Sequence, residues 1–192
     1  MAMKVFEWHQ NTTEYAAFAP KAYSDHEKAL LFASGQDVVG SISFRKIGDA
    51  ASVSDNPMCG VPGAVLVSNR ALQSLPQLSS VGCSVEVDLQ GELVERPFWL
   101  VRINKVADCL DHARGRIDGL KDVYFFLGSA VPNNCPFKLP EHLARVFADG
   151  DFVEDVAANH LAGFEFSLLW DSDKGGKQMV LAGQHAELQW VR

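Results

Sequence analysis

The chain has 192 residues, of which 47% are hydrophobic, and its formal net charge is −7. This length suits one globular domain with a core that needs no disulfide or metal, and no apolar run reaches membrane-spanning length. The acidic balance disfavours nucleic-acid binding, because neutralising phosphates requires a basic surface. The first ten residues lack the basic and apolar regions of a signal peptide, which predicts a cytoplasmic protein.

The four cysteines are spread through the chain without any C-x-x-C pair. They are Cys59, Cys83, Cys109 and Cys135. Structural zinc sites and thiol redox motifs place their cysteines close together in sequence. We therefore expect buried, reduced thiols, and neither a zinc site nor a redox motif.

The first third of the chain predicts two strands and two irregular stretches. Residues 3–8 and 38–47 have strand patterns, and residues 11–28 are expected to form a loop with one helical turn. Residues 48–63 are rich in Ser, Asp, Gly and Pro, which predicts an irregular linker and a boundary. We expect residues 1–60 to form N-terminal strands and a loop that pack on an α+β domain of residues 61–192, as one compact unit.

Two segments, 65–89 and 146–169, each predict a strand, a capped helix and a second strand. The helix caps are Ser68 and Asp149, offset by 149 − 68 = 81 residues, and glycines Gly82 and Gly163 follow at the same offset as helix stops. The inward helix positions match in pairs: Ala71 with Phe152, Leu72 with Val153, and Leu75 with Val156. The match indicates either a duplicated unit or two similar elements without common origin.

Strands dominate the rest of the chain. Residues 98–106 are the strongest strand and are expected to be central, because their first half is continuously apolar. Residues 123–127 predict another buried strand, and Gly175-Gly176 marks a hairpin turn after which residues 179–191 pair back. The predicted fold is therefore α+β, with a mixed, mainly antiparallel sheet and a few short helices.

The common catalytic and phosphate-binding motifs are absent from the sequence. The closest approach to a site is Asp108, Cys109, Asp111 and His112. A Cys-His pair with a carboxylate is a possible nucleophile, and two carboxylates with a histidine are possible metal ligands. However, these residues are neighbours in sequence and no further ligand clusters with them. We expect a structural turn in which the aspartates accept backbone hydrogen bonds, with no catalytic residue, metal or cofactor.

The acid is concentrated in one stretch, residues 141–173, which holds eight acidic residues and one basic residue, Arg145, for a sum of 1 − 8 = −7. Helix-dipole matching and ordinary solvation explain part of this acid, and a basic protein partner explains the remainder. The residues predicted to contact the partner are Asp151, Glu154, Asp155, Asp171 and Asp173.

Three sequence blocks carry a resemblance to a known family. They are LVSNRALQSL, then PFWLVRINKVADCLD, then PFKLPEHLARVFADGDFVEDVAANHLAGFEFSLLW. Their succession of a Ser-capped helix, a strand ending in Val-x-Asp-x-Leu-Asp, and a helix followed by Leu-x-Gly-aromatic-x-Phe resembles the polymorphic-toxin immunity proteins of the group called immunity protein eleven. The resemblance covers about residues 61–170. The chain departs from the family's Asp-aromatic-Leu step at Asp55, Asn56 and Pro57.

This resemblance implies a bacterial cytoplasmic protein of interbacterial competition, encoded beside a toxin that it neutralises by tight one-to-one binding. It implies a toxin C-terminal domain as partner, and no enzymatic activity, nucleic acid or membrane. The toxin's target (RNA, DNA, a nucleotide cofactor or a protein) stays open. Two other classes of function stay open: an adaptor or assembly subunit, and an enzyme built on residues 108–112.

Overall fold

The computed structural model describes residues 2–50, 52–90, 97–117, 122–182 and 185–191. The strands are β1 (Lys4–Gln10), β2 (Ala17–Pro20), β3 (Ile42–Ile47), β4 (Ala64–Ser68), β5 (Gly82–Gln90), β6 (Phe98–Ile103), β7 (Pro136–Leu139), β8 (His142–Asp149), β9 (Phe164–Asp171), β10 (Gly175–Ala182) and β11 (His185–Val191). The helices are α1 (Tyr23–Ala33), α2 (Asn69–Ser74), α3 (Pro76–Val81), α4 (Gly150–Ala158) and the 3₁₀ turn η1 (Gly128–Ala130). None of the helices in the described part of the chain is long and apolar enough to cross a bilayer.

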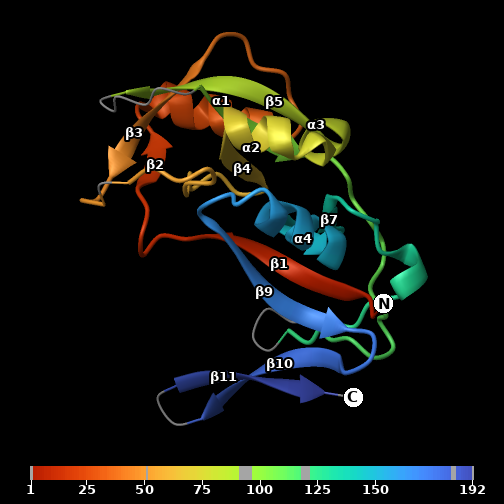
Figure 1. The fold of residues 1–192 in the computed structure, drawn as a ribbon. Coiled ribbons are helices and arrows are strands. Elements are labelled where there is room, and N and C mark those ends of the chain that lie inside the picture. The colour runs from red at the N-terminus through yellow and green to blue at the C-terminus, as the bar shows by residue number, and fades with distance from the viewer. Residues whose placement is uncertain (1, 51, 91–96, 118–121, 183–184, 192) are drawn as a thin grey trace.

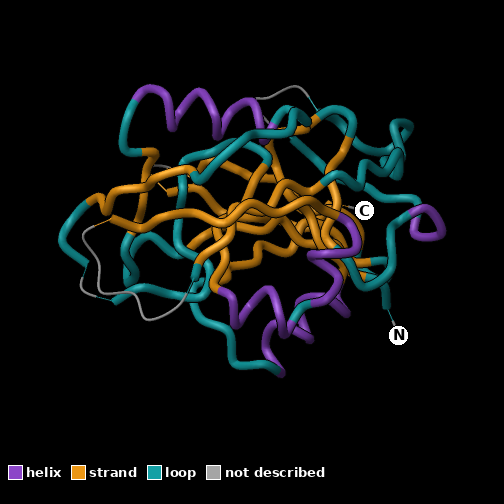
Figure 2. Tube along the Cα trace, turned by 90° about the horizontal axis from the view of Figure 1, so that it is seen from above, coloured by secondary structure: helices purple, strands orange, loops and turns teal. Residues whose placement is uncertain are grey.

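The strands form two sheets, which lie one above the other in Figure 1. The first sheet has the order β11-β10-β9-β1-β8-β7 and the second has the order β2-β3-β5-β6-β4. The strands pair antiparallel except for β3 and β5, which are parallel. The α+β class and the mixed, mainly antiparallel pairing are thus confirmed, distributed over two sheets rather than one. Figure 2 shows α2, α3 and α4 on one side of the strands and α1 on the other.

Both predicted strand-helix-strand units are present and share one topology. In the first, β4 and β5 flank β6 and are antiparallel to it, with α2 and α3 between them in sequence. In the second, β8 and β9 flank β1 in the same way, with α4 between them in sequence. Each unit is therefore a split β-α-β arrangement, with two parallel strands separated by a third. Pro76 divides the first helix in two because proline has no backbone donor.

Both predicted helix caps are confirmed. Ser68 Oγ accepts a hydrogen bond from the backbone N–H of Ala71 at 3.1 Å, and Asp149 Oδ1 accepts one from that of Phe152 at 3.3 Å. The glycines behave differently from each other. Gly163 has a left-handed φ of +84°, whereas Gly82 is extended and begins β5. Gly82 is the C-cap of α3, so its prediction as a helix stop is confirmed, whereas α4 already ends at Ala158, before Gly163.

The two units pack against each other through their matched positions. One core cluster contains Val65 with Val146, Val67 with Ala148, Ala71 with Phe152, and Leu75 with Val156, each pair separated by the same 81 residues. Trp8 of β1 and Val101 of β6, from the two inserted strands, lie in the same cluster. Leu72 and Val153 are only partly buried, so their predicted burial is wrong.

Residues 1–60 contribute to both sheets, since β1 lies inside the first and β2 and β3 form one side of the second. The predicted loop at 11–28 contains β2, which the sequence analysis missed, and the start of α1, a full helix where one helical turn was expected. The predicted strand at 123–127 is also wrong: Val123 and Phe126 each form one isolated bridge, although residues 123–126 are all buried. The hairpin turn before Gly175 is confirmed, and β10 pairs with β11 beyond it.

The segment predicted as a linker contains a buried connector between the two units, residues Ser54, Asp55 and Asn56. The Asp55 carboxylate accepts hydrogen bonds from Ser68 Oγ at 2.6 Å and from the Ala162 N–H at 3.1 Å. Asn56 Oδ1 accepts one from the Trp8 indole at 2.8 Å, and its Nδ2 donates to Leu66 O at 2.8 Å. The connector therefore binds β4 of one unit and both the inserted strand and the helix–strand loop of the other.

Removing either helix cap tests the equivalence of the two units. We expect Ser68→Ala and Asp149→Ala each to lower the free energy of unfolding by about 1–2 kcal/mol, because each leaves a helix N–H without its acceptor. Urea unfolding followed by circular dichroism measures this. Ser24→Ala, an exposed serine on α1, is the matched control. Losses no larger than that of the control would show that the caps contribute nothing to stability.

Removing the Asp55 carboxylate tests the connector. We expect Asp55→Ala to lower the free energy of unfolding by about 3 kcal/mol, because several donors lose a charged acceptor in a buried site. The exposed Asp49→Ala, in the same irregular stretch, is the control. An Asp55→Ala loss below about 1 kcal/mol would contradict the proposed coupling.

Candidate functional site

The predicted partner-binding residues separate into exposed and internally bonded carboxylates. Asp151 and Glu154 lie exposed on α4, whose apolar side, with Phe152 and Val156, is buried in the core. Among the described residues neither Asp151 nor Glu154 forms an ion pair. These two residues, one helical turn apart, are named the acidic face of α4.

Asp155 does not turn freely to solvent, which corrects the expected orientation. It is half-buried, and its Oδ2 accepts hydrogen bonds from Gln77 Nε2 at 2.6 Å and Asn134 Nδ2 at 3.1 Å. The Asn134 backbone N–H in turn donates to Asp149 Oδ2 at 2.7 Å. This network ties α4 to α3 and to the loop before β7, so Asp155 holds the acidic face in place.

Asp171 is also buried, with a relative exposure of only 2%. Its Oδ1 accepts from the backbone N–H of Asp173 at 2.9 Å and shapes the turn between β9 and β10. Asp173 itself is exposed. Since β8 and β9 are parallel and both pair with β1, this turn lies at the carboxyl ends of these two strands, where α4 begins. The turn that carries Asp173 is therefore at the same end of the sheet as the start of α4, which the sequence alone did not fix.

The one basic residue of the acidic stretch does not neutralise α4. Arg145 on β8 lies 3.6 Å from Glu7 and 3.8 Å from Asp122, and it donates to the Tyr124 hydroxyl at 3.1 Å. Its strand neighbour Val146 points into the core beneath α4. Because side chains alternate along a strand, Arg145 faces the opposite side of the sheet.

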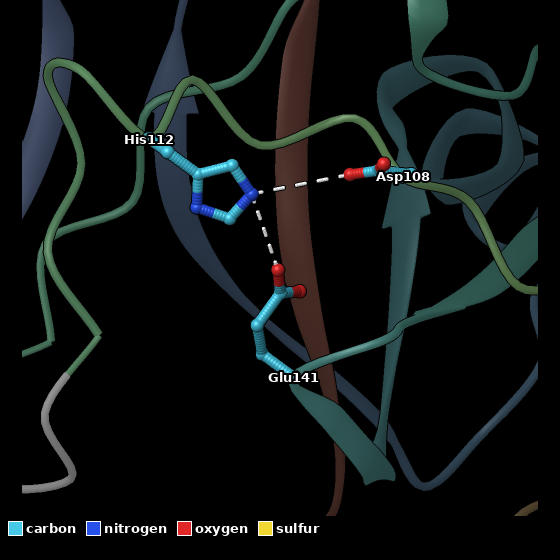
Figure 3. A group of neighbouring side chains, drawn as sticks. All are labelled: Asp108, His112 and Glu141. Atoms are coloured by element: carbon cyan, nitrogen blue, oxygen red, sulfur yellow. Dashed lines mark ion pairs between the residues drawn. The ribbon is translucent and has the colours of Figure 1, made fainter.

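A second cluster joins Asp108 and His112 with Glu141, as Figure 3 shows. His112 Nε2 lies 3.3 Å from Glu141 Oε1 and 3.9 Å from Asp108 Oδ1, and all three residues are exposed. Such a group is able to pair a protonated imidazole with two carboxylates or to hold a divalent cation with open positions. The sequence analysis missed Glu141, which lies in the turn between β7 and β8, and distant convergence of this kind has no local signal.

The cysteine of this segment is separated from the histidine. Cys109 is fully buried, whereas His112 is exposed. Burial, reinforced by the charges of Asp108 and Glu141, raises the pKa of the Cys109 thiol to about 12, so the nucleophilic thiolate is suppressed. The structure therefore offers no support for a Cys-His nucleophile. Asp111 does accept the expected backbone bond, from Ala113 N–H at 3.1 Å, whereas Asp108 faces His112.

Comparison with known proteins does not assign this chain to a family. No protein-family model matches it, and no curated protein matches its sequence.

Thiol accessibility provides a direct check of the cysteine environments. Burial raises the pKa of Cys59 to about 11 and that of Cys109 to about 12. Cys83 is exposed and Cys135 only partly buried, so the expected burial is wrong for these two. In native protein at pH 8 we expect Ellman's reagent to modify Cys83 within minutes, and Cys59 and Cys109 only on unfolding. Mass mapping of the modified peptides identifies the sites, and fast native labelling of Cys109 would contradict its placement.

Proposed function

We propose that this protein is an immunity protein, which binds a cognate bacterial toxin domain one to one and occludes its active or substrate-binding surface. The proposal places it in the bacterial cytoplasm, beside the site of toxin action. Its sequence support is the resemblance over residues 61–170 to the immunity protein eleven group. Such a protein carries out no chemistry of its own, so affinity and association rate set its activity.

The observation that carries the proposal is the exposed acidic face of α4. Asp151 and Glu154 are exposed without an ion pair among the described residues, and Arg145 is engaged on the other side of the sheet. Toxins that act on nucleic acids or nucleotides have basic substrate clefts. An acidic helix face complements such a cleft and accelerates association by electrostatic steering. The toxin partner is therefore expected to be basic.

The identity of the partner is testable from the gene neighbourhood. We expect the adjacent upstream gene to end in a small basic toxin domain that forms a one-to-one complex with this protein. Co-expression should rescue growth, and light scattering after gel filtration should give the mass of the pair. A housekeeping operon at that position would favour the adaptor function instead.

Charge reversal on α4 tests the binding surface. We expect Asp151→Lys with Glu154→Lys to slow association with the toxin domain at low salt by about tenfold, and to flatten the salt dependence, because steering is lost. Stopped-flow kinetics at low and high salt measure both quantities. Glu27→Lys with Asp37→Lys is the matched control, because both residues are exposed, Glu27 on α1 and Asp37 four residues after its end. Helix α1 lies on the opposite side of the strands from α4 (Figure 2). An unchanged rate and salt slope would place the interface elsewhere.

The enzyme alternative rests on the Asp108, His112 and Glu141 cluster, which is the one specific observation in its favour. If the cluster is structural, His112→Ala and Glu141→Gln leave protection from the toxin unchanged. Growth rescue by each variant, compared with the wild-type chain, measures this. Hydrolase or transferase activity of the pure protein that disappears in either variant would support the enzyme instead.

A further inference from the structure

Lys138 is a largely buried lysine with no counter-charge among the described residues. It lies on β7 with a relative exposure of 5%. Its backbone is fixed on both sides, since its N–H donates to Lys105 O at 2.8 Å and its carbonyl accepts from Ala107 N–H at 2.9 Å. Among the described residues its ammonium forms no ion pair and no hydrogen bond. Buried charges in proteins are normally paired or bind a ligand.

The nearest charge makes the environment of Lys138 more positive. Arg102, whose relative exposure is 7%, repels Lys138, and burial together with this repulsion lowers the pKa of the Lys138 ammonium. The Arg102 guanidinium is itself occupied: Nε donates to Asn104 Oδ1 at 2.7 Å and Nη1 donates to Phe32 O at 2.8 Å. Of the two side chains, only that of Lys138 forms no hydrogen bond among the described residues.

Both cations line a hollow of about 510 Å³ between the end of α1, the end of β6, β7 and the start of β8. This volume falls in the range of small-ligand sites. No acidic residue is among the described residues that line it, although the chain has 24 of them. Its walls are largely apolar and include three exposed large side chains, Leu30, Val106 and Leu143.

We propose that this hollow binds a small organic monocarboxylate with an apolar chain, whose carboxylate pairs with the Lys138 ammonium. The apolar walls suit an alkyl chain better than a fully hydrated anion such as phosphate. The Lys138 ammonium, which has no hydrogen-bond acceptor among the described residues, pairs with one carboxylate. The limited volume favours a free small acid over the end of a protein chain. This site is separate from α4 and does not depend on the proposed function.

Octanoate and the neutral 1-octanol are the matched probes. We expect saturable one-to-one binding of octanoate to the full chain by isothermal titration calorimetry, and at least about tenfold weaker binding of octanol, which lacks the charge that pairs with Lys138. Equal affinity for the two probes, or no octanoate binding up to millimolar concentration, would overturn the proposal.

Lys138→Met tests the assigned cation. It should weaken octanoate binding at least about tenfold and leave octanol binding unchanged or tighter, because the variant loses only the charge. Lys105→Met, an exposed lysine outside the hollow, is the control and should bind octanoate as the wild type does. Unchanged octanoate affinity in Lys138→Met would overturn the assignment.

Leu143→Asp provides a second test, because Lys138 is buried and its replacement could disturb the fold. Leu143 is exposed on the wall, so the fold is kept while the new carboxylate repels the ligand. Loss of octanoate binding supports the site, and retention contradicts it.

A capped tripeptide ending in leucine, tested as free acid and as amide, distinguishes a small acid from the end of a protein chain. Tighter binding of the peptide acid than of octanoate would overturn the assignment to a free small acid.

Discussion

The Asp55 carboxylate is the interaction on which the arrangement of the two split β-α-β units depends. It bonds to the Ser68 hydroxyl at 2.6 Å, which caps the helix of the first unit, and to the Ala162 N–H, which precedes the last strand of the second. Arg70 Nη1, at 3.0 Å, supplies the positive charge, and its Nη2 continues to Asn159 O at the end of α4. Because a buried carboxylate needs all its donors, the two units are held in one relative orientation.

This orientation decides what α4 shows to solvent. The equivalent helices of the two units bury their matched residues, such as Ala71 and Phe152, in one shared core, so their opposite sides face outward. Asp155, bonded to Gln77 on α3, fixes the rotation of α4 about its axis. The side chains of Asp151 and Glu154 then point to solvent. The acidic face therefore follows from the packing of the apolar side of α4. A partner that recognises this face meets a rigid surface.

The sequence predicted the features that depend on local pattern. Caps at Ser68 and Asp149 and the apolar periodicity of α4 are local, and the structure confirms them. Features that depend on distant partners were missed or misread. Residues 54–56 have linker composition, yet they are buried because Trp8, Ser68 and Ala162 supply hydrogen-bonding partners from elsewhere in the chain. The Glu141 contact with His112 and the unpaired Lys138 likewise arise only when separate segments meet.

The acidic stretch shows why counting charges along a sequence overestimates a binding surface. Of the five carboxylates expected at the interface, Asp155 bonds to side chains of other segments and Asp171 is buried in a turn. Each accepts hydrogen bonds from donors within the chain, so each stabilises the fold. Strand alternation also sends Arg145 to the opposite side of the sheet, which removes the one cation that the sequence places nearby. The field at α4 therefore comes from fewer carboxylates than the sequence suggests.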